Sequence, residues 1–72
     1  MVQYGINIKH YREIACISQA QLGEIVGVKQ QIVNWWEGNK RVPNAIQLAL
    51  IADTLGVKMD DLRSGGIATL HR

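Results

Sequence analysis

Residues 18–43 constrain the fold of this chain more than any other stretch. Ser18 is a residue type that caps helix N-termini, and Gln21, three positions later, completes the Ser-x-x-Gln pattern of a capping box. Gly27 follows an apolar segment that includes Leu22. A glycine there can adopt the left-handed conformation that ends a helix. These signals predict a short helix that ends in a glycine-centred turn.

A second short helix is predicted over residues 29–37, beginning within about three residues of the turn. When residues 29–37 are plotted at about 100° per residue, Val33 and Trp36 fall on one side and are expected to be buried. Leu22 of the preceding helix is expected to be buried as well. The opposite side carries Gln30, Gln31, Asn34 and Trp35. Two short helices joined this tightly cross steeply, so the stretch is interpreted as a helix-turn-helix.

The polar side of residues 29–37 is unusual for a solvated surface, where Glu and Lys are the common choice. Carboxamides carry paired donors and acceptors, and they bond in bidentate fashion to adenine in the major groove of DNA. Gln and Asn are also ordinary surface residues, but cations at Lys29, Lys40 and Arg41 flank this helix on both sides and favour the DNA interpretation. The candidate base-reading residues are therefore Gln30, Gln31, Asn34 and Trp35.

At these positions the sequence resembles the helix-turn-helix family of lambdoid phage repressors, Cro proteins and their bacterial relatives. The resemblance rests on Ser18-Gln19, Leu22, Gly27-Val28, Val33, Trp36-Glu37, Lys40-Arg41 and Pro43, with Ile8 and Arg12 upstream and Leu48, Ile51-Ala52, Leu55-Gly56-Val57 and Leu62 downstream. It covers about residues 4 to 63. It implies an all-α, compact domain of five short helices, in which the second and third form the helix-turn-helix. Such domains usually bind double-stranded DNA as homodimers.

The resemblance also implies roles for single residues. Arg12 is expected to pair with Glu37 and tie the first helix to the end of the third, which makes Glu37 a structural residue and not a catalytic acid. Gln19 is expected to reach a phosphate and to brace Gln30. The expected phosphate-binding residues are Gln19, Lys29, Lys40 and Arg41. The dimer contact is expected on the last two helices, through Ile46, Leu50 and Met59.

Three positions depart from the family pattern. Cys16 stands where a glycine often ends the first helix, so strain or a shifted helix end is expected there. Gly23 replaces a usual alanine, which lowers helix stability by about 1 kcal/mol. In the loop after Glu37, the family usually has glycine at the second position, whereas here Gly38 is first and Asn39 is second. Asparagine tolerates a positive φ better than most residues, so the turn is expected to survive.

The remaining elements follow from apolar spacing and helix-end signals. A first helix is predicted over residues 4–15, with Tyr4, Ile8, Tyr11 and Ala15 as its buried stripe. Pro43 and Asn44 are expected to begin a fourth helix that Gly56 ends, with Leu48, Ile51, Ala52 and Leu55 facing inward. A short fifth helix is predicted up to Leu62. Residues 1–63 then form the DNA-binding domain, and residues 64–72 are expected to be a flexible tail, or else an arm that orders against a partner.

Charge and composition agree with this interpretation. Residues 18–43 carry three cations against two acids, whereas residues 44–62 carry one cation against three acids, so basic charge gathers near the proposed DNA side. The single cysteine cannot form an internal disulfide, and no apolar run approaches the roughly 18 residues of a membrane span. A cytoplasmic protein is therefore expected, and the resemblance implies that a bacterium or a phage encodes it.

Catalysis is poorly supported by the sequence. His10 and His71 are far apart, and no metal-ligand spacing or phosphate-binding glycine loop is visible, so no cofactor or metal is expected. The favoured function is a transcriptional regulator, most simply a repressor, whose dimer covers a palindromic operator. The alternative is a protein-interaction module on the same fold, such as an antitoxin-like protein, with an apolar contact at Ile25, Ile32 and Trp35. Trp35 suits either a thymine methyl or a pocket on a partner protein.

Overall fold

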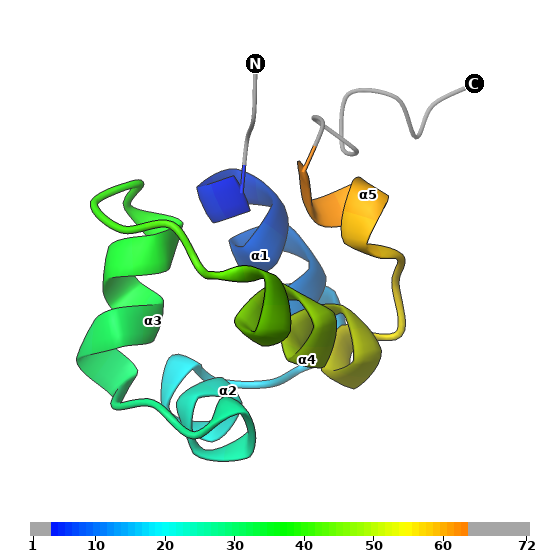
Figure 1. Ribbon diagram of the computed structural model, residues 1–72. Helices are drawn as coiled ribbons and strands as arrows, with labels where there is room; N and C mark the ends of the chain where they lie inside the picture. The colour runs from blue at the N-terminus through cyan, green and yellow to red at the C-terminus, as the bar shows by residue number, and fades with distance from the viewer. Residues whose placement is uncertain (1–3, 64–72) are drawn as a thin grey trace.

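A computed structural model describes residues 4–63 of the chain, and every regular element within them is an α-helix (Figure 1). The helices are α1 (Tyr4–Ile14), α2 (Gln19–Val26), α3 (Gln30–Glu37), α4 (Ala45–Leu55) and α5 (Met59–Arg63). The expected all-α, five-helix architecture is confirmed. The tail expected at residues 64–72 lies outside the described residues.

Capping boxes begin α2 and α4. The Ser18 hydroxyl accepts a hydrogen bond from the Gln21 backbone N–H at 3.0 Å, and the Gln21 side chain accepts one from the Ser18 backbone N–H at 2.8 Å. Asn44 and Gln47 make the same reciprocal pair at 2.8 and 2.9 Å. Asn44 therefore caps α4 as expected, but Pro43 precedes the cap and is not part of the helix.

Helices α1 to α4 share one kind of C-terminus, the Schellman motif. A residue with left-handed φ follows each helix: Cys16 (φ 59°), Gly27 (φ 89°), Asn39 (φ 60°) and Gly56 (φ 72°). The next N–H then reaches a carbonyl five residues back, as from Ile17 to Arg12 at 3.1 Å. Because Cys16 takes this position, α1 ends at Ile14, earlier than expected, and Ala15 is exposed and not part of the buried stripe.

The core lies between the five helices, and each of them contributes at least one buried residue. Its buried apolar residues are Ile8, Tyr11, Leu22, Val33, Trp36, Leu48, Ile51, Ala52 and Leu62. The predicted inner sides of α3 and α4 are thus confirmed at Val33, Trp36, Leu48, Ile51 and Ala52, while Leu55 is partly buried. Burial raises the pKa of the Tyr11 phenol, and the carboxylate of Asp61 adds to this effect.

Two contacts of α1 position the other helices. A Cβ on Gly5 would lie 2.7 Å from the carbonyl oxygens of Trp36 and Glu37, so only glycine lets α1 come this close to the end of α3. The buried Asn7 donates from Nδ2 to the Leu62 carbonyl at 2.9 Å and thereby ties α1 to α5. α3 lies along one side of the molecule, which is on the left in Figure 1.

Candidate nucleic-acid interface

The outward side of α3 carries three of the four residues expected to read bases. Gln30, Gln31 and Asn34 are exposed, whereas Trp35 is half-buried. Val33 and Trp36 lie on the opposite side of the helix, at 0% and 1% exposure. The strict separation leaves the carboxamides free of the core, on a short helix that the turn at Gly27 holds against α2.

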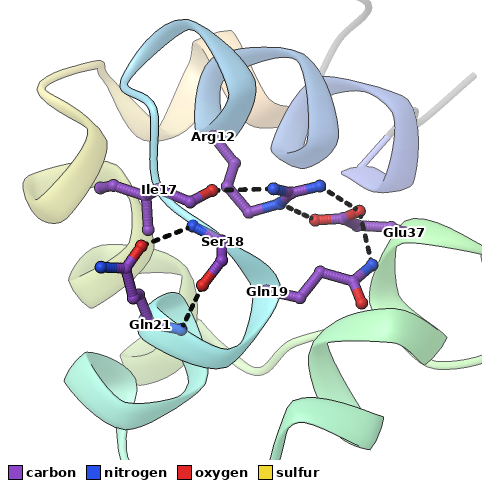
Figure 2. A network of polar contacts seen from close by, with 6 residues as sticks. All are labelled: Arg12, Ile17, Ser18, Gln19, Gln21 and Glu37. Carbon is purple, nitrogen blue, oxygen red and sulfur yellow. Dashed lines mark hydrogen bonds and ion pairs between the residues drawn. The ribbon is translucent and has the colours of Figure 1, made fainter.

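The end of α3 is tied to α1 and α2 by a polar network around Glu37 (Figure 2). Arg12 Nε donates to Glu37 Oε2 at 2.6 Å, and Arg12 Nη2 donates to Oε1 at 3.1 Å. The third guanidinium nitrogen, Nη1, donates to the Ile17 carbonyl at 2.8 Å. The ion pair expected from the sequence is present, and both side chains are largely buried, at 11% and 5% exposure.

The amide of Gln19 joins the same network, where Nε2 donates to Glu37 Oε1 at 3.0 Å (Figure 2). The expected brace to Gln30 is not among the hydrogen bonds of the described residues, because the Gln19 amide is turned toward Glu37. An amide nitrogen carries two hydrogens, so this bond uses one of them. Gln19 therefore lies beside the α3 face and is half-buried there.

The network removes a negative charge from the candidate interface. Its hydrogen bonds to Glu37 raise the pKa of Arg12; burial opposes that rise, and the negative charges of Glu37 and Glu13 support it. Arg12 thus stays cationic and neutralises the carboxylate at the end of α3. Lys29, Lys40 and Arg41, the cations that flank α3 in the sequence, are all exposed.

A hollow of about 320 Å³ lies on the α1 side of α3. Its lining residues are Lys9, Arg12, Gln19, Asn34, Glu37, Gly38 and Lys40. Lys9 is a cation that the sequence reasoning missed. Its signal was available, because Lys9 lies three residues before Arg12 and therefore projects from the same region of α1. Lys9 and Lys40 give this hollow its exposed positive charge.

A second hollow of about 310 Å³ lies between α3, α4 and the loop that joins them. Its lining residues are Val28, Ile32, Trp36, Arg41, Val42, Asn44 and Gln47. Ile32, one of the three residues of the alternative apolar contact, is partly buried and packs against the core. Arg41 borders this hollow, and its guanidinium carbon lies 5.6 Å from the centroid of the Trp35 ring. The neighbouring cations Lys40 and Arg41 therefore border different hollows.

The residues expected at a dimer contact are on the surface of α4 and α5. Ile46 is 75% exposed, and Leu50 and Met59 are each 42% exposed. α4 packs against α5, so these residues belong to neighbouring helices. Ile6, Ile14, Ile25 and Val42 are further large apolar residues on the surface.

Two further features are absent from residues 4–63. No group of three or more His, Cys, Asp or Glu side chains is placed to hold a metal ion there. None of the helices in this part of the chain has the length and hydropathy needed to cross a membrane.

Comparison with known proteins gives a consistent pattern. The sequence profile of the helix-turn-helix family matches residues 8–62. The P22 c2 repressor, solved with a synthetic operator, is 32% identical to this chain, with a TM-score of 0.81 over 86% of this chain and 94% of that one. SinR, a master regulator for biofilm formation solved with DNA, is 28% identical, with a TM-score of 0.75 over 82% and 95% of the two chains. No curated protein sequence matches significantly.

Several of the similar structures are of one enzyme. Hydroxypropylphosphonic acid epoxidase from S. wedmorenis is 26% identical, with a TM-score of 0.76. The match spans 88% of this chain but only 35% of the epoxidase chain. The likeness therefore concerns about a third of that enzyme and carries the fold alone.

Proposed function

The chain belongs to the helix-turn-helix family, and from this premise we propose that it is a DNA-binding transcription regulator, most simply a repressor, that binds its operator through α3. The observation that carries the proposal is the exposed carboxamide side of α3 among exposed cations, with the one acid of that helix neutralised by Arg12. The DNA complexes of the P22 c2 repressor and SinR support the same function for this chain.

In the proposed complex, α3 enters the major groove and its side chains contact base edges. Gln30, Gln31 and Asn34 offer paired donors and acceptors, which suit adenine N6 and N7. Their exposure supports this role, because no side chain of the core has to move before they reach a base. Trp35, the fourth candidate, is half-buried.

The phosphates are proposed to be held on both sides of α3. Lys29 precedes the helix and is exposed. Gln19 has a second amide hydrogen to offer, and Lys40 and Arg41 follow the helix in the loop. To this set we add Lys9, which borders the same hollow as Lys40. Such contacts fix the orientation of a protein on the duplex without reading its sequence.

A homodimer on a palindromic operator is the proposed assembly. Two copies related by a twofold axis would place their α3 helices in adjacent major grooves about 34 Å apart. The proposed contact uses Ile46, Leu50 and Met59, whose apolar surface is exposed in one copy. In a twofold contact each of these residues is buried once in each copy, so the apolar area buried is twice that of one patch.

The alternative role as a protein-interaction module receives less support from the geometry. It requires an apolar contact at Ile25, Ile32 and Trp35. Ile32 packs against the core, and Arg41 covers the ring of Trp35, which leaves Ile25, 54% exposed, as the main apolar surface of that set.

Selection from a random pool of DNA duplexes tests the proposed function. We expect an inverted repeat with adenine in each half-site, bound with an affinity that falls steeply with salt. Gln30→Ala should relax the preference at one base pair by about 1–3 kcal/mol. Lys29→Ala is the matched control. Loss of a phosphate contact should weaken binding to all DNA sequences equally, and it should lower the slope of log affinity against log salt concentration by about 0.9. Failure to retain any duplex, with capture of a protein instead, would favour the alternative.

A further inference from the structure

Trp35 differs from the other candidate base-reading residues in exposure and position. If successive residues are placed about 100° apart, Gln31 lies at the centre of the outward side of α3, and Asn34 and Trp35 each lie about 50° from it, on opposite sides. Trp35 is on the side of the partly buried Ile32 and is itself half-buried, whereas Asn34 is exposed. The indole lies next to Arg41 of the loop that follows α3.

Two contacts join Trp35 to Arg41 in that loop. The guanidinium carbon of Arg41 lies over the indole, 5.6 Å from the ring centroid. The carbonyl oxygen of Trp35 accepts hydrogen bonds from the backbone N–H groups of Lys40 at 2.9 Å and Arg41 at 3.3 Å. The carbonyl thus fixes where the Arg41 main chain runs, and the indole lies beneath the guanidinium carbon.

This arrangement prepares Arg41 for an anionic ligand. An arginine in a loop has many rotamers, and confining them on binding opposes affinity. A guanidinium stacked on an aromatic ring has lost part of that freedom before binding, while its N–H donors lie in its own plane and stay available at the edge. Arg41 is exposed, so these donors are accessible from solvent.

We propose that Trp35 is a positioning residue that holds the guanidinium of Arg41 for a DNA phosphate beside α3, and that Trp35 does not read a base. This inference rests on the proposed function, because it requires a duplex against α3. Lys40 provides an internal comparison. It is the adjacent cation, but it borders the hollow on the other side of α3 with Lys9 and Asn34.

A matched pair of variants separates the effect of the aromatic face of Trp35 from the effect of its apolar volume. Trp35→Leu keeps an apolar side chain without a π face, whereas Trp35→Phe keeps a π face. The measurement is the dissociation constant for one selected operator as a function of NaCl concentration. Arg41→Ala should lower the salt slope by about 0.9, the value for one phosphate contact. Trp35→Leu should move the slope toward that of Arg41→Ala and weaken binding by about threefold to tenfold, with Trp35→Phe close to wild type.

A double-mutant cycle completes the test. The variant Trp35→Leu/Arg41→Ala should bind no more weakly than Arg41→Ala, because the ring acts through the guanidinium. Lys40→Ala is the control, and its effect should add to that of Trp35→Leu. Circular dichroism checks folding. If Trp35→Leu does not fold, Trp35→Met offers the same test, since a flexible thioether side chain fills irregular space.

Other outcomes overturn the inference. A Trp35→Leu variant with an unchanged salt slope and a relaxed preference at one base pair would assign Trp35 to base reading. Additive losses from Trp35→Leu and Arg41→Ala would show that the two residues act separately. If the wild-type protein binds no duplex, the proposed function fails as well, and this is seen before any variant is compared.

Discussion

Glu37 is a carboxylate at the end of the helix proposed to enter DNA, where a free negative charge would repel phosphates. Two hydrogen bonds from Arg12 and one from Gln19 occupy it. A buried ion pair adds little net stability, because both charges lose their hydration. Its effect here is to join three helices at one point and to leave the surface around α3 to Lys29, Lys40 and Arg41.

Glu37→Ala should lower the free energy of unfolding by about 3–5 kcal/mol, because Arg12 would remain buried without its partner. Denaturant unfolding monitored by circular dichroism measures the change. Glu24→Ala is the control, since Glu24 is exposed on α2 and its loss should change stability by no more than about 0.5 kcal/mol. A loss below about 1 kcal/mol for Glu37→Ala would mean that the pair behaves as an exposed one.

Among the helices, the shared C-terminal motif explains how five short segments pack within 60 residues. The left-handed residue reverses the chain within one turn after α1, α2, α3 and α4. Glycine occupies this position after α2 and α4 and asparagine after α3, and these residue types tolerate it best. Only α1 uses a residue without this tolerance, Cys16 at φ 59°.

Cys16→Gly should therefore raise the free energy of unfolding by about 0.5–1 kcal/mol. The left-handed conformation costs a residue with a Cβ about 1–2 kcal/mol, and the greater freedom of glycine in the unfolded chain offsets part of that gain. Cys16→Ala keeps the Cβ and should change stability little. Denaturant unfolding of both variants under reducing conditions measures the difference. Equal stability of the glycine and alanine variants would contradict the strain attributed to Cys16.

Across the whole molecule, the sequence was sufficient wherever a feature depends on neighbours within a few positions. The capping boxes at Ser18 and Asn44 and the inner sides of α3 and α4 follow from local spacing, so they were predictable. The Arg12–Glu37 pair joins residues 25 positions apart, and its prediction rests only on the resemblance to a known family.

Features that depend on how helices meet were not predictable from spacing. The bond from Asn7 to the Leu62 carbonyl spans 55 positions, and a buried asparagine has no periodic signature. The turn of Gln19 toward Glu37 depends on where α2 crosses the end of α3. The contact of the Arg41 guanidinium with the Trp35 ring depends on the loop conformation after α3, which includes the left-handed Asn39. The separate roles proposed for the residues of the interface therefore follow only from the three-dimensional structure.

The proposed dimer makes a final prediction for the whole molecule. Replacing both Ile46 and Leu50 with serine should weaken self-association at least about tenfold, a change of about 1.4 kcal/mol, because a twofold contact buries each residue twice. Sedimentation velocity over a range of concentrations measures it. The matched control replaces Ile6 and Ile14, exposed on α1, with serine and should leave self-association unchanged. On DNA, the Ile46/Leu50 variant should bind a single half-site like the wild type but lose the advantage of an inverted repeat. Equal binding of both variants to the full repeat would place the dimer contact elsewhere on the surface.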